Sequence, residues 1–405
     1  MRTVAVVGVS LAGLRAIETL RREGYDGRIV AIGGEPHLPY DRPPLSKELL
    51  AGTSEPDDVR LRKQGVDDLD AEWLLGTRAT ALDVGARELT LADDTRITYD
   101  GLVLATGSTP RLLPSQPALA TENGMAGLFV LRTLDDAMAL RTALEAGPKV
   151  VVIGAGFIGA EVAATCRGRG LDVTVLEALP QPMVRGLGPE LGAVIADMHR
   201  DHGVDLRTGV GVEAIEGDTR VERVRLADGE VIAADVVVVG VGVVPDTTWL
   251  EGSGLTLENG VVCDETCLAA PGVVAAGDVA RFPNRLFDGD MMRLEHWTNA
   301  TEQGVHAARR LLAGDAGTDL AFAPVPFVWS DQYDRKIQTV GVVSAEADLH
   351  VAHGSYAERQ FVALFGRHGR IVGALGFNRA RQVMQYRRLI ADRADWDAAL
   401  QLANA

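Results

Sequence analysis

The sequence predicts an α/β protein with two Rossmann-like dinucleotide-binding domains followed by a C-terminal α+β domain. Two segments, residues 3–35 and 149–177, share one order of features: an apolar run, a glycine-rich turn, an amphipathic stretch, a second apolar run and a final acid. That order is typical of a strand, a phosphate-binding turn, a helix and a second strand. Beyond about residue 320 the pattern changes to short strand-like runs, which indicates a third unit.

The composition argues against several classes of protein. A formal net charge of −16 over 405 residues argues against nucleic-acid binding. No apolar run approaches the roughly 20 residues that a membrane span requires, so we expect a soluble, cytoplasmic protein. The cysteines are Cys166, Cys263 and Cys267, a small odd number that fits a reducing compartment. The two in "CDETC" lack the spacing of a zinc site, and we interpret them as ordinary thiols without a metal.

The second repeat carries a complete dinucleotide motif. Gly154, Gly156 and Gly159 form G-x-G-x-x-G directly after the apolar run "VVVI". In this motif the glycines allow a tight turn, a close approach of the backbone to a pyrophosphate and close packing of helix on strand. Glu177 follows the next apolar run, where a carboxylate accepts hydrogen bonds from both ribose hydroxyls and repels a 2′-phosphate. The predicted NAD contacts are Gly154, Gly156, Phe157, Ile158, Gly159 and Glu177.

The first repeat departs from the motif at one position. Gly8 and Gly13 are present in "GVSLAG", but Ser10 replaces the middle glycine. Serine is small enough to preserve the approach of a phosphate, and its hydroxyl can donate to one; a plain surface turn is the alternative. Glu35 takes the place of the ribose acid, and we expect this repeat to bind FAD.

Three further apolar runs connect the repeats and predict the domain boundaries. "YDGLVLATGSTPR" and "ADVVVVGVGVVPD" are interpreted as strands that carry the chain between the two lobes, and "GVVAAGDVARF" as a strand that ends at Gly277. The last unit should contain four short strands and a helix over residues 380–393. The predicted domains are an FAD-binding domain in two parts, residues 1–112 and 241–319, an NAD-binding domain over residues 113–240, and the α+β domain over residues 320–405.

Five motifs together resemble one family. "YDRPPLSK", "LATGSTPR", "GAGFIGAEVAA", "AAGDVA" and "EHWTNATEQG" occur in this order over nearly the whole chain. They are similar to motifs of the FAD-dependent, NADH-utilising ferredoxin reductases of bacterial oxygenase systems, of the putidaredoxin-reductase and biphenyl-dioxygenase-reductase type. The resemblance implies a glutathione-reductase-like fold, bound FAD and oxidation of NADH. It also implies that single electrons pass to a 2Fe-2S ferredoxin, which supplies a haem monooxygenase or a Rieske-type dioxygenase.

The resemblance assigns a role to each matched position. Asp278 would hold the ribityl chain or a flavin-side phosphate, and Trp329 would reach the flavin from the last domain, with a core position as its alternative. Because hydride transfer needs positioning more than proton removal, His296 is not expected to act as a base. The implied FAD contacts are Gly8, Ser10, Gly13, Glu35, Arg42, Lys47, Thr106, Gly107, Arg132, Gly277, Asp278, Glu295, His296, Trp297 and Trp329.

The stretch from Pro43 to Lys47 contains no cysteine, although disulfide reductases of this fold carry a redox-active pair beside the flavin. Without a thiol relay, electrons must leave the flavin directly for an outside acceptor. The prolines stiffen the backbone, so that Arg42 and Lys47 can face the cofactor; a rigid turn with solvated cations is the alternative. By resemblance, Lys47 and Glu161 form a catalytic pair near flavin N5. The alternative makes Glu161 a surface acid in the first turn of its helix, where it suits the helix dipole.

One segment opposes the charge of the whole chain. Residues 359–393 contain eight arginines and one acid, a local charge of +7. Ferredoxins of this kind are generally acidic, so the segment is expected to attract one. A solvated helix face is the alternative interpretation, and the helix of Arg309 and Arg310 is the alternative docking surface. The expected docking residues are Arg379, Arg381, Arg387 and Arg388.

Other functions share parts of this pattern. A rubredoxin reductase would differ only in its partner. An NADH oxidase, peroxidase or disulfide reductase of the same fold would usually need a redox cysteine beside the flavin. A flavin-based module that senses NADH is the alternative outside the enzymes.

Overall fold

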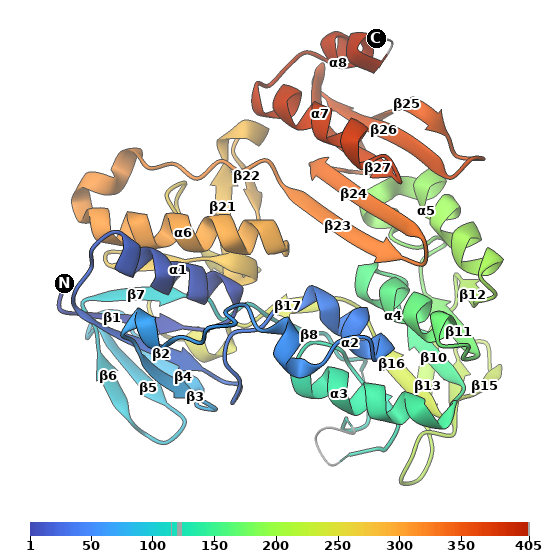
Figure 1. The fold of residues 1–405 in the computed structure, drawn as a ribbon, viewed down its shortest axis with the longest axis horizontal. Helices are drawn as coiled ribbons and strands as arrows, with labels where there is room; N and C mark the ends of the chain where they lie inside the picture. Colours follow the sequence, from blue (N-terminus) through green and yellow to red (C-terminus); the bar gives the residue numbers. More distant parts are fainter. Residues whose placement is uncertain (115, 120–123, 404–405) are drawn as a thin grey trace. The chain divides into compact units, whose positions relative to one another are not determined.

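The computed structural model describes residues 1–114, 116–119 and 124–403. They form an α/β fold with parallel sheets and a C-terminal antiparallel sheet, which confirms the predicted fold class (Figure 1). The chain divides into two compact units. The first contains Met1–Asp41, Arg60–Thr109 and Val244–Val328, and the second contains Arg42–Val59, Pro110–Val243 and Trp329–Ala405. The three predicted domain boundaries remain a prediction.

The first unit is built around a six-stranded sheet of order β19-β20-β7-β1-β2-β3, in which all neighbours are parallel except β19 and β20. Its strands are β1 (Thr3–Val7), β2 (Arg28–Gly33), β3 (Glu72–Leu75), β7 (Gly101–Leu104), β19 (Leu268–Ala270) and β20 (Val273–Ala275). Helices α1 (Leu11–Arg22) and α6 (Trp297–Ala313) lie side by side, as Figure 1 shows. Strand β1 is buried on both faces: Val4 and Val6 pack with the helices, and Ala5 and Val7 pack on the opposite side.

Two small sheets complete the first unit. One contains β4 (Ala79–Asp83), β5 (Glu88–Leu91) and β6 (Arg96–Thr98). The other contains β18 (Val261–Val262), β21 (Ala280–Asn284) and β22 (Asp290–Met292). Leu82, Leu89 and Phe282 from these sheets share a hydrophobic core with the face of the main sheet that α1 does not cover. The short strands β8 (Ser108–Pro110) and β17 (Val243–Pro245) lie where the chain passes from one unit to the other.

The second unit repeats the Rossmann pattern in a parallel sheet of order β12-β11-β10-β16-β9. Its strands are β9 (Leu128–Phe129), β10 (Val150–Ile153), β11 (Val173–Glu177), β12 (Asp205–Thr208) and β16 (Val236–Val239). The helices of this part are α2 (Glu48–Ala51), α3 (Leu134–Ala143), α4 (Phe157–Gly168) and α5 (Val184–Asp201). Val150 and Val152 pack toward α4, whereas Val151 and Ile153 pack toward the small sheet. That small sheet contains β13 (Val212–Glu216), β14 (Arg223–Leu226) and β15 (Val231–Ala233).

The C-terminal part of the second unit is a five-stranded sheet of order β23-β24-β27-β26-β25, with antiparallel pairing from β24 to β25. Its strands are β23 (Phe327–Gln332), β24 (Arg335–Gly341), β25 (Asp348–Ser355), β26 (Gln360–Arg367) and β27 (Arg370–Phe377). Helix α5 packs on it through Leu191 and Met198. Helix α7 (Ala380–Ala391) packs against β27 and β24.

The prediction for this last part was incomplete. It contained four of the five strands and lacked β25, an edge strand whose residues are exposed or half-buried and so carry no clear apolar pattern. The predicted helix over residues 380–393 ends earlier, at Ala391. A short final helix, α8 (Trp396–Ala403), was also missing from the prediction. Among residues 1–114, 116–119 and 124–403, no helix is both long and apolar enough to cross a lipid bilayer.

Candidate functional site

The three glycines of the second repeat differ in their steric surroundings. Gly154 has φ +102°, and a Cβ there would lie 2.4 Å from the carbonyl oxygen of Gly240. A Cβ at Gly159 would lie 2.1 Å from the carbonyl oxygen of Gly154. At Gly156, by contrast, no atom of the described residues outside its own helix and chain neighbours lies within 4 Å of the position that a Cβ would take. The fold therefore requires the first and third glycines, and the middle one leaves an open position beside the backbone at the start of α4. That space fits a pyrophosphate on the helix N-terminus.

Glu177 stands at the end of β11 and is tied to the glycine turn. Its Oε2 accepts a hydrogen bond from the backbone N–H of Ala155 at 2.8 Å, and its Oε1 accepts from Leu179 at 2.9 Å. Each carboxylate oxygen keeps a second lone pair. Near the same turn, Ile158 is 47% exposed, although isoleucine is among the residues most often buried in folded proteins. These features fit the ribose and an apolar face of a bound dinucleotide.

The first repeat has the same steric pattern. Gly8 has φ +93°, and a Cβ there would lie 2.2 Å from the carbonyl oxygen of Ala105. A Cβ at Gly13 would lie 1.9 Å from the carbonyl oxygen of Gly8. Ser10 caps α1 with φ −76°, close to the φ of −73° at Gly156, which caps α4. Because this conformation suits any residue and the matching position is open, serine fits the turn without strain.

Glu35 ends the first repeat just after β2. Its Oε2 accepts a hydrogen bond of 2.5 Å from the hydroxyl of Tyr40, which is buried. The carboxylate is thereby held at the carboxyl end of the parallel sheet, where a ribose acid of this fold lies.

The other predicted flavin contacts of the first unit form two hydrogen-bonded clusters. In the first, the hydroxyl of Thr106 donates to the carbonyl oxygen of Asp246 at 3.0 Å, and the N–H of Asp246 donates to the carbonyl oxygen of Gly107 at 3.0 Å. In the second, the carboxylate of Asp278 accepts from the hydroxyl of Ser108 at 2.9 Å. These contacts arrange the ends of β7 and β20, which are neighbours in the sheet.

The N-terminus of α6 carries the next three predicted contacts. The indole N–H of Trp297 donates to Asp41 Oδ1 at 2.7 Å, and Glu295 forms an ion pair of 2.6 Å with Arg293. Burial lowers the pKa of His296 to about 4, although the charge of Asp278 acts in the opposite direction. The ring is therefore neutral near pH 7. Within the described part of the chain, its Nδ1 is buried and has no hydrogen-bond partner, which fits a polar ligand group at this place.

Three more predicted contacts belong to the second unit. The guanidinium of Arg42 donates to the carbonyl oxygen of Arg132, which joins the loop before the 3₁₀ turn Pro43–Ser46 to the loop before α3. That second loop is fixed by a capping box, in which Thr133 and Asp136 satisfy each other's backbone N–H groups. Trp329 is half-buried in β23.

Lys47 and Glu161 come together in the second unit. Lys47 Nζ lies 2.6 Å from Glu161 Oε2, and their side chains are 14% and 4% exposed. Glu161 is thus not a surface acid. The alternative prediction also placed Glu161 in the first helical turn, and this was wrong. Helix α4 begins at Phe157, so Glu161 lies in the second turn. The two cations of this stretch are likewise held by the protein and are not simply solvated.

Several residues of this site were absent from the prediction. The carboxylate of Glu161 also accepts a hydrogen bond of 2.5 Å from Ser46 and one of 2.6 Å from Ser330. Gln303 of α6 is fully buried and accepts a hydrogen bond of 2.9 Å from the N–H of Gly277. Ser46 and Gln303 lie within the motifs "YDRPPLSK" and "EHWTNATEQG", in which other residues received roles, whereas Ser330 belongs to no motif that indicates its contact.

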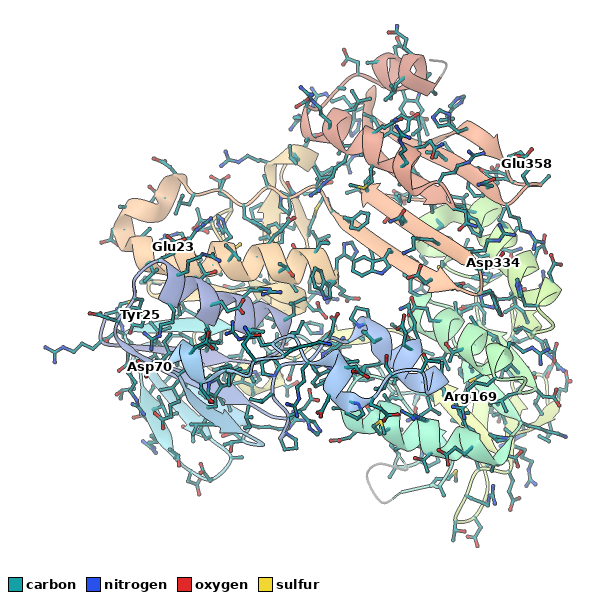
Figure 2. The ribbon with its side chains drawn as sticks, in the orientation of Figure 1. Glu23, Tyr25, Asp70, Arg169, Asp334 and Glu358 are labelled. Carbon is teal, nitrogen blue, oxygen red and sulfur yellow. The ribbon has the colours of Figure 1, made fainter. Side chains whose placement is uncertain are left out.

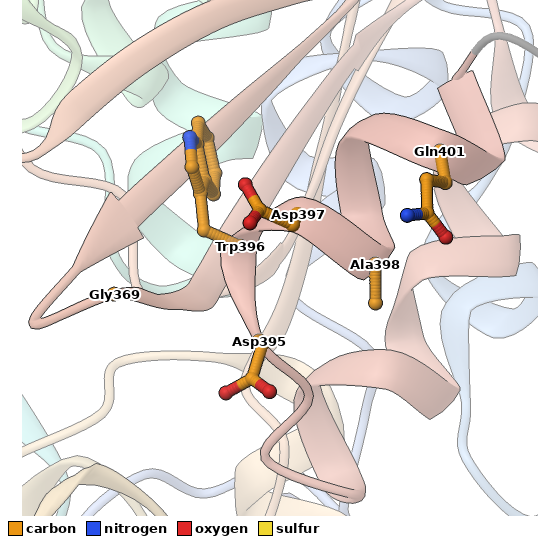
Figure 3. Close-up of a pocket in the computed structure, with 6 residues that line it drawn as sticks. All are labelled: Gly369, Asp395, Trp396, Asp397, Ala398 and Gln401. Carbon is orange, nitrogen blue, oxygen red and sulfur yellow. The ribbon is translucent and has the colours of Figure 1, made fainter.

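One cysteine contacts this set of residues, since Cys267 Sγ accepts a hydrogen bond of 3.4 Å from the amide of Gln303. All three thiols are free and buried, and burial raises the pKa of Cys166 and that of Cys267 to about 12. A pocket of about 530 Å³ lies at the start of α8 and holds two carboxylates beside Trp396 (Figure 3). It contains no predicted site residue. Its lining residues are Gly369, Asp395, Trp396, Asp397, Ala398 and Gln401.

Comparison with known proteins agrees with this arrangement. Residues 2–304 match the pyridine nucleotide-disulphide oxidoreductase family, and residues 327–405 match the reductase C-terminal family. The chain therefore belongs to the pyridine nucleotide-disulphide oxidoreductases and, within them, to the ferredoxin reductases of oxygenase systems.

Two curated relatives and one solved structure illustrate the likeness. The ferredoxin reductase subunit of 5,5'-dehydrodivanillate O-demethylase from a Sphingobium species is 39% identical, over 96% of this chain and 92% of the relative. Rhodocoxin reductase from Rhodococcus erythropolis is 38% identical, over 100% of this chain and 94% of the relative. The reductase in a covalent putidaredoxin reductase–putidaredoxin complex matches with a TM-score of 0.91 and 33% identity, over 99% of this chain and 98% of that one.

Proposed function

We propose that the protein oxidises NADH through a bound FAD and passes single electrons to a 2Fe-2S ferredoxin that supplies a haem monooxygenase or a Rieske-type dioxygenase. The observation that carries this proposal is the buried Lys47–Glu161 pair, which joins a cysteine-free Pro43–Lys47 stretch to α4 of the NAD-binding lobe. A disulfide reductase would need a reactive thiol pair beside the flavin. Here the three thiols are buried and their pKa values are raised, so they remain protonated and unreactive near pH 7.

In this proposal the two glycine turns bind two different dinucleotides. The turn at Gly8, Ser10 and Gly13 holds the FAD pyrophosphate, with Glu35 at its ribose. Asp278 and the neutral ring of His296 contribute polar contacts to the rest of the cofactor. Bound FAD would supply the conversion of a two-electron hydride into single electrons.

NADH binding is proposed for the second turn. The open position at Gly156 receives the pyrophosphate, and Glu177 accepts the ribose hydroxyls with the lone pairs that its backbone contacts leave. Exposed Ile158 packs against an apolar part of the nucleotide. Lys47 and Glu161 then act at the place where the nicotinamide delivers its hydride. The acid holds the ammonium group in one position by an ion pair whose two side chains are only 14% and 4% exposed.

The ferredoxin partner follows from the relatives. One solved relative is a reductase joined to putidaredoxin, and several curated relatives are named as ferredoxin reductase components. A cytoplasmic location belongs to the same proposal, because free buried thiols are compatible with a reducing compartment.

We place the docking site on the exposed face of α7, formed by Arg381, Met384 and Arg388 and called here the α7 patch. Arg381 is exposed, Met384 is 39% exposed and the side chain of Arg388 is 89% exposed, with its Nε 3.5 Å from Asp392. Their spacing of three and four residues puts them on one side of the helix. Two cations around a flexible apolar side chain suit an acidic protein partner.

The other arginines are less accessible. Arg379 and Arg387 are half-buried. On α6, Arg310 is 5% exposed and donates to Thr266 and Gly314. Arg309 pairs with Glu23 at the end of α1, a residue labelled in Figure 2. The alternative surface on α6 therefore offers at most one cation to a partner.

The proposal is tested by NADH-dependent reduction of cytochrome c, with and without a 2Fe-2S ferredoxin. A ferredoxin reductase should show strong dependence on added ferredoxin, and iodoacetamide should leave its NADH oxidation unchanged. Rapid reduction with rubredoxin alone would favour a rubredoxin reductase. NADH oxidation that thiol alkylation abolishes would favour a disulfide reductase, and flavin reduction without transfer to any acceptor would favour an NADH sensor.

A further inference from the structure

A line of buried polar side chains leads from Glu161 through the second unit. Ser330 donates to Glu161 Oε1 at 2.6 Å, and the amide of Gln332 donates to the hydroxyl of Ser330 at 3.1 Å. The Oε1 atom of Gln332 lies 3.0 Å from His199 Nε2, and His199 Nδ1 lies 2.9 Å from the hydroxyl of Tyr333. The four residues beyond Glu161 come from β23, from the turn that follows it and from α5.

The hydrogen bonds of this line can run in one direction only. Ionised Glu161 accepts and cannot donate, so the hydroxyl proton of Ser330 must point to it. Ser330 then accepts from the amide nitrogen of Gln332, whose oxygen is left to accept a proton from His199 Nε2. His199 must therefore carry a proton on Nε2, and in the neutral ring Nδ1 accepts from the hydroxyl of Tyr333. Each donor has an acceptor along the line, and the last acceptor is the carboxylate.

Most residues of this line are buried, so breaking one of its hydrogen bonds would leave a buried polar group without a partner, which costs free energy. Ser330 and Gln332 are fully buried, and His199 is 3% exposed. Burial lowers the pKa of His199 to about 4, which agrees with a neutral ring. Tyr333 is held between two histidines, since the ring of His202 stacks on it at 3.7 Å and His199 meets it edge-on at 5.3 Å. Asp334, labelled in Figure 2, follows in the same turn.

We propose that Ser330, Gln332 and His199 are positioning residues that fix the Glu161 carboxylate against Lys47 for hydride delivery, an inference that rests on the function proposed for that pair. Ser46 and Lys47 donate to Oε2, whereas among the described residues only Ser330 donates to Oε1. Opposed donors on the two oxygens set the rotation of the carboxylate, and with it the position of the ammonium group. The C-terminal domain thus contributes to the nicotinamide site through β23. The line holds a position and does not conduct protons, because an amide such as Gln332 has no acidic proton to pass on.

The kinetic test uses pairs of variants that remove or keep one donor. Ser330→Ala is expected to slow the reduction of bound flavin by NADH about tenfold in anaerobic stopped flow, whereas Ser330→Thr keeps the hydroxyl and the rate. His199→Phe is expected to slow it about threefold, and His199→Gln, which can still donate an N–H, should restore most of the loss. In a Glu161→Gln background, Ser330→Ala should have no further effect. An additive loss in that background would show a structural defect only and would contradict the proposal.

The chain offers a matched control for the end of the line. Tyr386 is buried, whereas Tyr333 is half-buried, and its hydroxyl likewise lies within hydrogen-bond distance of a histidine, 3.0 Å from His353, but no described contact links this pair to Glu161. Tyr333→Phe should slow flavin reduction measurably, and Tyr386→Phe should not. Equal effects of the two variants on the rate would overturn the proposal.

A second measurement needs no turnover. In flavin-loaded protein labelled with ¹⁵N-histidine, His199 should be neutral at pH 7 with its proton on Nε2, and Ser330→Ala should shift its Nε2 signal. The signal is assigned by its loss in His199→Gln. A proton on Nδ1 would overturn the proposal, since Gln332 would then donate to His199 and its oxygen would take the hydroxyl proton of Ser330 away from Glu161.

The kinetic results also separate this inference from the function on which it rests. Loss of rate in Lys47→Ala and Glu161→Gln without loss in Ser330→Ala would refute the positioning line and leave the pair in its proposed role. Wild-type rates in Lys47→Ala and Glu161→Gln would refute the role of the pair, and the positioning line with it.

Discussion

Lys47 and Glu161 are 114 residues apart in the sequence, yet Nζ and Oε2 are 2.6 Å apart in a largely buried ion pair. Lys47 follows a proline-stiffened 3₁₀ turn, and Glu161 lies on the helix that begins at the NAD-binding turn. The contact therefore couples the segment after the first repeat to the start of the second repeat. Breaking one partner of a buried pair leaves the other charge without compensation.

The first prediction concerns this pair. Lys47→Ala and Glu161→Gln should each slow the reduction of bound flavin by NADH about tenfold or more, because the reacting groups lose their fixed position. The FAD content of the purified variants, measured by absorbance, should stay close to that of the wild type. A variant that loses FAD in proportion to its activity would instead point to a role in cofactor retention.

The second prediction concerns nucleotide choice. A 2′-phosphate charge 4 Å from Glu177 costs about 4 kcal/mol at an effective dielectric of 20, and half of that still exceeds tenfold in kcat/KM. The wild type should therefore prefer NADH over NADPH strongly, and Glu177→Arg should reduce that preference. Glu177→Gln serves as the control, since it keeps an acceptor for one backbone N–H and removes only the charge. Equal efficiency with both nucleotides in the wild type would place the ribose acid elsewhere.

The third prediction separates two kinds of glycine. Gly154→Ala should lower the free energy of unfolding by more than about 2 kcal/mol, because a Cβ there meets a backbone carbonyl and the φ angle is positive. Gly156→Ala should leave unfolding nearly unchanged and raise KM for NADH about tenfold, because the added methyl group enters only the open space beside α4. Urea unfolding and steady-state kinetics on the two variants check both parts. Comparable loss of stability in both variants would contradict the assignment of that space to the nucleotide.

The fourth prediction concerns docking. Reversing Arg381 and Arg388 to Glu should lower the association rate with an acidic 2Fe-2S ferredoxin about tenfold and flatten its dependence on salt, because steering by these charges is lost. Reduction of ferricyanide, which needs no docked protein, should hardly change. A double reversal at Arg96 and Arg285, which are also exposed, alters the net charge equally and is the control. Equal losses in the two double variants would show an effect of overall charge and refute the α7 patch.

The fifth prediction concerns stability against pH. Burial lowers the folded pKa of His199 to about 4, with the nearby His202 acting in the same direction and Gln332 opposing it. As the pH falls below about 6.5, His199 becomes protonated in the unfolded chain but stays neutral in the folded protein. The free energy of unfolding therefore decreases from that pH down to about pH 4. Between pH 6.5 and 5 the wild type should lose about 1.5 kcal/mol more than His199→Gln, which has no ring to protonate. Parallel curves from urea unfolding would show that His199 is not buried in its neutral form.

Much of the fold could be predicted from the sequence because its signals are local. A glycine turn between an apolar run and an amphipathic run needs no distant residue to be recognised, and both nucleotide-binding lobes follow from it. The edge strand β25 and the helix α8 could not be predicted in the same way, since an exposed strand and a short helix carry weak apolar patterns. For the same reason the end of α7 was placed two residues too late.

The sequence by itself determined the two dinucleotide turns, their terminal acids and the absence of a thiol pair between Pro43 and Lys47, because each is a property of residue order within a few positions. Only the tertiary structure decided that Glu161 is buried and shared between Ser46, Lys47 and Ser330, and that Gln332, His199 and Tyr333 continue from it. Those contacts join segments far apart along the chain. Burying a carboxylate costs free energy unless hydrogen-bond donors surround it. In this fold those donors come from segments that are distant in the sequence, so no local pattern reveals their positions.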